Sequence, residues 1–210
     1  MLFYILRHGE TDMNKKGVMQ GRMDVPLNHN GRELAVLTGR AMAGIRFDKC
    51  FSSPLVRAKE TAETVLRESG NDVPVMIDER ITEIDFGVFD GKCFSEAGEQ
   101  AHVFFTKPFE FTGFPGGERV REVCDRTQAF LKEQIAKDDG GTYLTSMHGC
   151  AMRAMVNFLL EDPADYWLGR APYNCSVTVV RAEGGKASMV ETDKVFYDKS
   201  LIVDYYRSWD

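Results

Sequence analysis

The first nine residues constrain this chain most, because a short apolar strand runs directly into Arg7, His8 and Gly9. Five consecutive apolar residues, 2–6, are typical of a strand that is covered on both faces. Gly9 then allows the backbone to turn sharply. Ligands bind at the carboxyl ends of strands in open α/β sheets. An arginine and a histidine at such an edge can hold an anion and attack it.

Strand and helix patterns alternate along the rest of the chain. Strands are predicted at 49–52, 73–77 and 142–146, helices at 32–43, 55–68, 118–137 and 151–160, and a late hairpin at 176–181 and 187–191. The glycine-rich segment 11–28 is predicted to be a loop over the strand edge. We therefore expect an α/β fold with a mostly parallel, mixed sheet flanked by helices, and a single domain over 1–210.

Residues 88–117 lose helical and strand periodicity, and phenylalanines crowd a stretch that glycines and prolines punctuate. This pattern predicts a lid or small cap insertion, partly helical, beside the site. The phenylalanines are equally consistent with the core of the cap and with an apolar wall for the substrate.

A serine cap and a proline, at 52–54, predict that the helix 55–68 begins directly after a strand. Arg57 then lies in the first turn, where free N–H groups and the positive end of the helix favour an anion. The plainer alternative is a solvated arginine on the helix surface. Glu83 and His148 also follow predicted strands, so parallel strands would bring them to the edge that holds Arg7 and His8.

These side chains supply what phosphoryl transfer requires: a positive cradle, an in-line nucleophile and an acid for the leaving oxygen. Imidazole attacks when it is neutral, and the charges of Arg7 and Arg57 would keep His8 neutral. A partly desolvated carboxyl group stays protonated more readily and can serve as the acid. Glu83 is the first candidate for this acid and Asp85 the second.

Four blocks of sequence are distinctive: 7–11 (Arg-His-Gly-Glu-Thr) with Asn14, 52–55 (Ser-Ser-Pro-Leu) with Arg57 and Thr61, Glu83 before Phe86 and Gly87, and 146–149 (Ser-Met-His-Gly). In this order and spacing they resemble the histidine phosphatase superfamily, in its phosphoglycerate-mutase-like branch. The resemblance extends over nearly the whole chain.

The resemblance implies a phosphohistidine mechanism without a metal or another cofactor. His8 would attack phosphorus, while Glu83 would protonate the leaving group and then activate water. Arg7, Arg57 and His148 would hold the phosphoryl oxygens. The matching substrate-binding positions are Asn14, Gln20, Gly21 and Gly149; Asn174 matches a position near the pocket but is not assigned a role.

Three alternatives to a phosphatase remain open. A phosphoglycerate mutase would need more positive charge around the lid, where only Lys92 and Lys107 are basic and the paired arginine of the mutases is missing. A catalytically silent phosphate-binding regulatory module is the second. A zinc site through His8 and His148 is the third, and the neighbouring arginines oppose a dication there.

The net charge of −6 provides no basic field for nucleic acid or an anionic membrane surface, so the expected partner is a small phosphorylated metabolite. Five scattered cysteines without a C-x-x-C pair suit a reducing compartment, and no signal segment is recognised, so we expect a cytoplasmic protein. The aromatic stretch 205–209 is predicted to pack on the body or across a homodimer.

Overall fold

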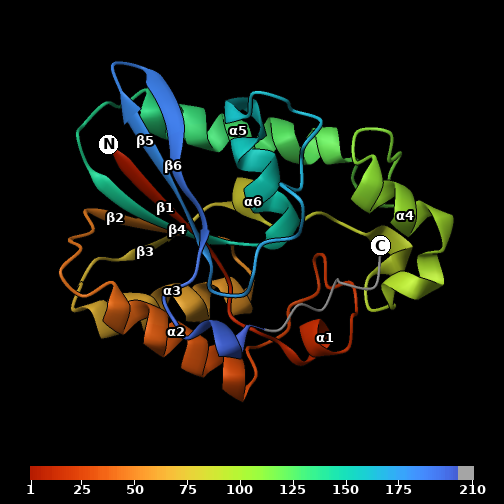
Figure 1. Cartoon of the computed structure of the whole chain (residues 1–210), viewed down its shortest axis with the longest axis horizontal. Helices are drawn as coiled ribbons and strands as arrows, with labels where there is room; N and C mark the ends of the chain where they lie inside the picture. The colour runs from red at the N-terminus through yellow and green to blue at the C-terminus, as the bar shows by residue number, and fades with distance from the viewer. Residues whose placement is uncertain (203–210) are drawn as a thin grey trace.

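The computed structural model describes residues 1–202, which contain one six-stranded sheet with helices on both faces (Figure 1). In the sheet order 3-2-4-1-5-6, the strands are β3 (Val75–Ile77), β2 (Lys49–Ser52), β4 (Thr142–Met147), β1 (Leu2–Arg7), β5 (Val177–Glu183) and β6 (Lys186–Lys194). Strands β1 to β4 are parallel, whereas β5 is antiparallel to β1 and β6 to β5. The predicted α/β fold with a mostly parallel, mixed sheet is confirmed.

The register of the two central strands determines where the histidines emerge. Strands β1 and β4 are neighbours, and Arg7 at the end of β1 pairs with Met147 at the end of β4. His8 directly follows β1 and His148 directly follows β4, so both residues leave the sheet at the same carboxyl edge.

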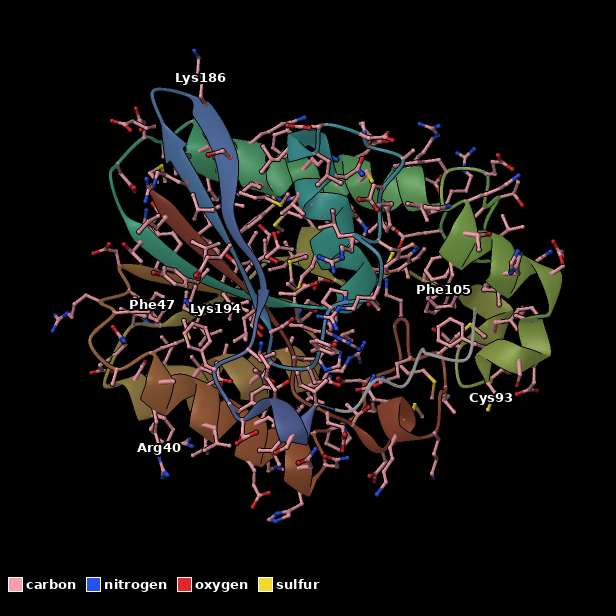
Figure 2. The ribbon with its side chains drawn as sticks, viewed as in Figure 1. Arg40, Phe47, Cys93, Phe105, Lys186 and Lys194 are labelled. Atoms are coloured by element: carbon pink, nitrogen blue, oxygen red, sulfur yellow. The ribbon has the colours of Figure 1, made fainter. Side chains whose placement is uncertain are left out.

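Helices cover both faces of the sheet, which explains the unbroken apolar run of β1. On one face lie α2 (His29–Ala41) and α3 (Val56–Ser69), and on the other α5 (Val120–Ile135) and α6 (Gly149–Val156) (Figure 1). Ile5 belongs to the core beneath α5 and α6, whereas Leu6 belongs to the core above α2 and α3. Successive strand residues thus point to opposite faces, and both faces are apolar. Figure 2 shows Phe47 between α2 and the sheet, while Arg40 points outward from α2.

The four predicted helices begin one to three residues from their predicted starts, and the capping residues of α2 and α3 differ from those expected. Helix α2 begins at His29, earlier than expected, because the Asn28 side chain caps it by accepting a hydrogen bond from the Gly31 N–H at 2.8 Å. The predicted serine cap of α3 is wrong. Its N-cap is Leu55, and the Asp24 carboxylate accepts instead from the first helical N–H, that of Val56, at 2.6 Å.

Three local features complete the body. The segment 11–28 is mostly irregular but contains the short helix α1 (Asp12–Lys15). A two-residue turn joins β5 to β6, and Gly184 and Gly185 both have positive φ, of 55° and 74°, which a type I′ hairpin turn requires. Helix α6 continues into the 3₁₀ helix η4 (Asn157–Leu159), and η1 (Glu79–Ile81) follows β3. The η5 turn (Lys199–Leu201) comes near the end, and the predicted packing of 205–209 lies outside the described residues.

Residues 88–117 form an additional layer at one end of the molecule, beside the carboxyl edge of the sheet (Figure 1). Their regular elements are η2 (Gly87–Phe89), η3 (Phe94–Ala97) and α4 (Glu99–Thr106). We refer to residues 88–117 as the lid. Within residues 1–202, no helix has both the length and the apolar character that crossing a membrane requires.

Candidate active site

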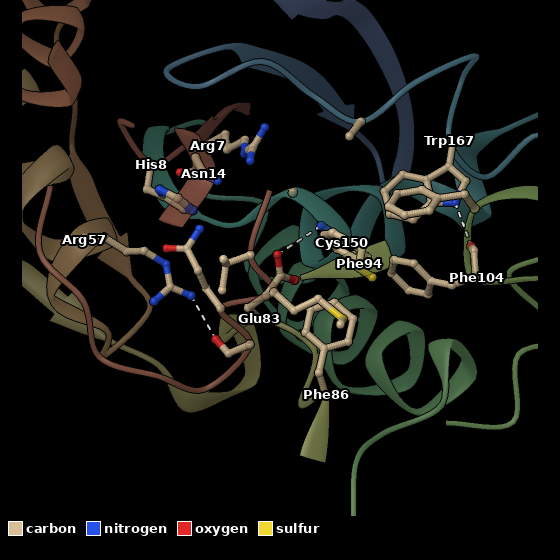
Figure 3. Close-up of a pocket in the computed structure, with 17 residues that line it drawn as sticks. Arg7, His8, Asn14, Arg57, Glu83, Phe86, Phe94, Phe104, Cys150 and Trp167 are labelled. Carbon is tan, nitrogen blue, oxygen red and sulfur yellow. Dashed lines mark hydrogen bonds between the residues drawn. The ribbon is translucent and has the colours of Figure 1, made fainter. Parts of the chain in front are cut away.

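A cavity that is partly open to solvent lies between the carboxyl edge of the sheet and the lid (Figure 3). One end is polar and the other apolar. The polar side chains and glycines on its wall are Arg7, His8, Asn14, Gln20, Gly21, Arg57, Glu83 and Gly149. The structure thus brings together on this wall all but one of the predicted site residues.

His8 is oriented by its own turn. Its Nδ1 lies 2.6 Å from the carbonyl oxygen of Gly9, which can only accept, so Nδ1 carries the hydrogen and the lone pair of the neutral ring is on Nε2. The Gly9 N–H donates to Thr61 Oγ1 at 2.9 Å and fixes this turn against α3. Burial, followed by the charges of Arg57 and Arg7, lowers the pKa of His8 well below 6.5. The imidazole is therefore neutral at neutral pH and has a nucleophilic nitrogen.

The two arginines reach the cavity from different elements. Arg57 lies in the first turn of α3 and is 1% exposed, and it donates to the carbonyl oxygens of Gly21 at 2.8 Å and Met23 at 2.6 Å. Burial lowers the pKa of Arg57 to about 10, so it remains charged. Arg7 donates to the carbonyl oxygen of Pro172. Two buried guanidinium groups at one end of the cavity favour a dianion such as phosphate.

His148 is the predicted site residue that does not line the cavity. It is fully buried directly behind His8, with the two ring centroids 5.2 Å apart. Its Nε2 lies 2.8 Å from Ser53 Oγ, and its Nδ1 has no hydrogen-bond partner among residues 1–202. Burial, then the charges of Arg57 and His8, lowers the pKa of His148 well below 6.5. A neutral ring with an unused nitrogen is thus placed next to His8.

Glu83 lies between the polar and apolar ends of the cavity (Figure 3). Its Oε1 accepts from the N–H groups of Ile84 and Ala151, both at 3.0 Å, and its Oε2 accepts from the N–H of Cys150 at 3.2 Å. The last two donors belong to the first turn of α6, which places this carboxylate at the positive end of a helix. Asp85, the second candidate for the acid, does not line the cavity and binds the Gly87 N–H at 2.7 Å.

The predicted substrate-binding residues fall into two groups. Asn14, Gln20 and Gly21 come from the segment that contains α1, and Gly149 opens α6 beside Arg7. Asn14 Oδ1 accepts from the Thr11 N–H at 3.1 Å, which leaves the amide nitrogen to donate. Asn174, which the sequence left unassigned, lies behind this wall and donates to the His8 carbonyl oxygen at 3.1 Å.

The apolar end includes residues that the sequence did not single out. Trp167 and Ala171 come from the irregular segment before β5, and Val18 and Met19 come from the loop after α1. No periodicity marks these positions. The lid phenylalanines divide between the two predicted uses: Phe94, Phe104 and Phe105 line the cavity, while Phe111 and Phe114 are buried in the core.

Cys150 also lines the cavity, and its thiol lies 3.1 Å from the Tyr166 hydroxyl. Burial and the charge of Glu83 raise the pKa of Cys150 well above its ordinary value. A neutral, buried thiol is a poor nucleophile, so Cys150 does not compete with His8 as a candidate nucleophile. Among residues 1–202, no group of three or more histidine, cysteine or acidic side chains is arranged to hold a metal ion.

Comparison with known proteins gives a consistent result. The model of the histidine phosphatase superfamily (branch 1) matches residues 3–194. The chain is 31% identical over 180 residues to the probable phosphoglycerate mutase GpmB of Salmonella choleraesuis (strain SC-B67), covering 83% of this chain and 82% of that protein. These matches confirm the resemblance that the sequence motifs predicted.

Two solved structures have the same fold. The fold is similar to that of Bacillus stearothermophilus YhfR, with a TM-score of 0.85, 29% identity, and coverage of 92% of this chain and 97% of that one. It is also similar to a phosphoserine phosphatase mutant of Entamoeba histolytica in complex with phosphoserine, with a TM-score of 0.78, 26% identity, and coverage of 92% and 97%.

Proposed function

The chain belongs to the histidine phosphatase superfamily, and we propose that it hydrolyses a small phosphomonoester through a phosphohistidine intermediate on His8. The observation that favours this most is the hydrogen bond from His8 Nδ1 to the Gly9 carbonyl oxygen, which leaves the Nε2 lone pair at a cavity that Arg7 and Arg57 also line. A neutral nucleophile and two fixed cations are what attack on a phosphate dianion requires.

In the first step the Nε2 lone pair of His8 forms a bond to phosphorus while the bond from phosphorus to the leaving oxygen breaks. Arg7 and Arg57 offset the charge on the phosphoryl oxygens, whereas His148 lies behind His8 and does not line the cavity. Glu83 in its acid form gives its proton to the leaving oxygen. Its Oε2 accepts one N–H bond whereas Oε1 accepts two, so Oε2 is the oxygen with room for that proton.

In the second step the Glu83 carboxylate takes a proton from a water molecule, and the oxygen of that water attacks phosphorus. The bond from phosphorus to nitrogen breaks, and the electron pair returns to His8 Nε2. Inorganic phosphate is released and Glu83 is again protonated, so the cycle needs no further reactant. Metal-independent chemistry is part of this proposal, because Arg7 and Arg57 already supply positive charge and would repel a dication beside His8.

Hydrolysis is favoured over a mutase by the distribution of charge. A phosphoglycerate mutase has to hold a carboxylate and a second phosphate while the phosphoryl group is on histidine. Among the described residues that line the cavity, Arg7 and Arg57 are the only cationic side chains, and both are at the phosphoryl end. A water molecule requires no additional cation.

Release of phosphate from a panel of phosphomonoesters in the presence of EDTA tests this function. We expect activity in the wild-type chain and none in His8→Ala, with an acid-labile phosphoenzyme in the wild type only. Unchanged hydrolysis by His8→Ala would overturn the mechanism. Isomerisation of phosphoglycerate, primed by a bisphosphate and with little phosphate release, would indicate a mutase. Tight binding of phosphorylated ligands without a phosphoenzyme would indicate a silent regulatory module.

A further inference from the structure

The apolar end of the cavity is built from two segments that lie far apart in the sequence. The lid contributes Phe94, Phe104 and Phe105, and the segment between α6 and β5 contributes Trp167 and Ala171 (Figure 3). Figure 2 shows Phe105 on the side of the lid that faces the body. We refer to Phe94, Phe104, Phe105 and Trp167 as the aromatic wall.

The aromatic wall is held in a fixed arrangement. The indole Nε1 of Trp167 donates to the carbonyl oxygen of Phe104 at 3.1 Å. The ring of Trp167 lies 5.2 Å from that of Phe104 and 5.4 Å from that of Phe105, and Phe94 lies 5.1 Å from Phe105. The inclined rings give favourable contacts, so the wall needs little rearrangement to pack against an apolar ligand.

No positive charge is available at this end among the described residues that line the cavity. The two lysines of the lid are used elsewhere, because Lys92 lies over the Phe89 ring at 4.9 Å and Lys107 pairs with Glu110 at 3.4 Å. A carboxylate or second phosphate packed against the aromatic wall would lose water without gaining a counter-charge, which is costly.

The position of Glu83 relates the wall to the reaction. Its carboxylate lies between the arginines and the aromatic wall, which is where the bridging oxygen of a phosphomonoester has to be if Glu83 protonates it (Figure 3). With the phosphoryl group at His8, the carbon skeleton attached to that oxygen therefore extends toward Trp167 and Phe105.

We propose that the leaving group of the substrate is an uncharged, apolar alcohol that contains a ring, and that the aromatic wall selects it against alcohols bearing a carboxylate or a second phosphate. This inference rests on the proposed phosphatase function and names the substrate class of the same site. Contact between rings supplies the selection for the apolar group, and desolvation of an unpaired charge supplies the selection against acidic esters.

Benzyl phosphate and 4-carboxybenzyl phosphate test the proposal, because the two esters share the reacting bond and differ by one carboxylate. We expect kcat/KM for benzyl phosphate to exceed that for the carboxylated ester by roughly 10²-fold or more, since an unpaired buried charge is penalised strongly. Equal values, or a preference for the carboxylated ester, overturn the proposal even when phosphate release depends on His8.

Variants at Phe105 test the wall directly. Phe105 is only partly buried, so Phe105→Arg places a cation at the cavity with little disturbance of the core. We expect this variant to raise the kcat/KM for 4-carboxybenzyl phosphate, relative to that for benzyl phosphate, by at least ~10-fold. Phe105→Leu should raise the KM for benzyl phosphate several-fold. Phe89→Leu is the control, because Phe89 is a partly buried lid phenylalanine that does not line the cavity.

The outcomes separate the two proposals. A selectivity ratio that stays the same in Phe105→Arg, with the fold intact by circular dichroism, overturns the role of the wall and leaves the phosphatase standing. If no ester, apolar or acidic, releases phosphate in a His8-dependent way, the phosphatase function itself fails and the substrate class fails with it.

Discussion

The guanidinium of Arg126 donates a hydrogen bond to the backbone carbonyl oxygen of Glu83 at 3.0 Å. The same group donates to the carbonyl oxygens of Arg80 and Thr82 and forms an ion pair with Glu118 at 2.9 Å. One side chain from α5 thus fixes the turn that presents the proposed acid. Arg126 itself does not line the cavity.

Arg126→Gln is expected to act through Glu83. It removes the ion pair and most of the carbonyl contacts, so we expect the free energy of unfolding to fall by about 1–3 kcal/mol. A displaced acid should lower kcat by ~10- to 100-fold with little change in KM. The loss should be larger for alkyl phosphates, which need a proton on the leaving oxygen, than for nitrophenyl phosphate.

Arg121→Gln is the matched control, because Arg121 lies on the same helix and contacts the Phe109 ring instead of the Glu83 turn. It should keep the wild-type ratio of the rates for alkyl phosphates and nitrophenyl phosphate. A purely structural role for Arg126 would reduce the hydrolysis of both esters by the same factor, and that result would contradict positioning of Glu83.

Acid is expected to destabilise the fold through His8 and His148. Burial and the nearby arginines lower both pKa values well below 6.5, so below pH 6.5 the unfolded chain binds up to two protons that the folded chain does not. The free energy of unfolding should therefore decrease as the pH is lowered, by about 1.4 kcal/mol per pH unit for each histidine. Asp90 opposes this, because burial raises its pKa to about 6 and the folded carboxyl group binds its proton first. The two histidines outweigh Asp90, so the free energy of unfolding decreases overall in acid.

Urea denaturation between pH 7.5 and pH 5 measures this loss, and the variants assign it. The double variant His8→Gln, His148→Gln should not lose stability in this window, because only the opposing effect of Asp90 remains, whereas Asp90→Asn should make the fall steeper. A double variant as acid-sensitive as the wild type would show that other groups are responsible.

Gly21 is expected to set the distance between its loop and the lid. Its φ is +40°, and a Cβ at this position would overlap Asp90 Oδ1 in the lid, while its carbonyl oxygen accepts from Arg57. Gly21→Ala should push the two segments apart, loosen Arg57 and raise KM by ~10-fold, and Asp90→Ala in the same chain should recover part of the loss. Gly17→Ala is the control, because Gly17 also has positive φ, +66°, but open space around its Cβ, so it should cost only about 1 kcal/mol of stability.

The polar half of the site could be predicted from the sequence because strand ends determine it. Once β1 and β4 are known to be parallel neighbours, the residues that follow them have to meet, and His8 and His148 do. His148 illustrates the limit of this argument, since the edge of the sheet was predictable but its place behind His8 depends on the contact with Ser53.

The apolar half could not be predicted, because long-range contacts of irregular segments create it. The aromatic wall forms where Trp167 donates to the backbone of Phe104, sixty-three residues away, and no local pattern encodes that pairing. The predicted serine cap of α3 was wrong for the same reason. The serines before it had the right local chemistry, but Asp24, thirty-two residues earlier in the chain, accepts the N–H of Val56.

Glu83→Gln is expected to separate the two chemical steps. The amide keeps the shape of the side chain but has no proton to transfer, so alkyl phosphates should be hydrolysed ~10²- to 10⁴-fold more slowly. Nitrophenyl phosphate needs little help with its leaving group, so His8 should still be phosphorylated. Without a base to activate water the phosphoenzyme should then persist, giving a burst of about one nitrophenol per active site before a slow steady state.

Rapid mixing with nitrophenyl phosphate measures this burst, and acid-labile phosphate on the protein should rise with it. Asp85→Asn is the matched control, because Asp85 lies two residues away and binds the Gly87 N–H outside the cavity. It should show no burst, and it should keep the wild-type ratio of the rates for alkyl phosphates and nitrophenyl phosphate. If Asp85→Asn gives the burst and Glu83→Gln does not, the acid and base of the reaction is Asp85. Equal losses for both esters in Glu83→Gln, without a phosphoenzyme, would mean that Glu83 serves only to hold the first turn of α6.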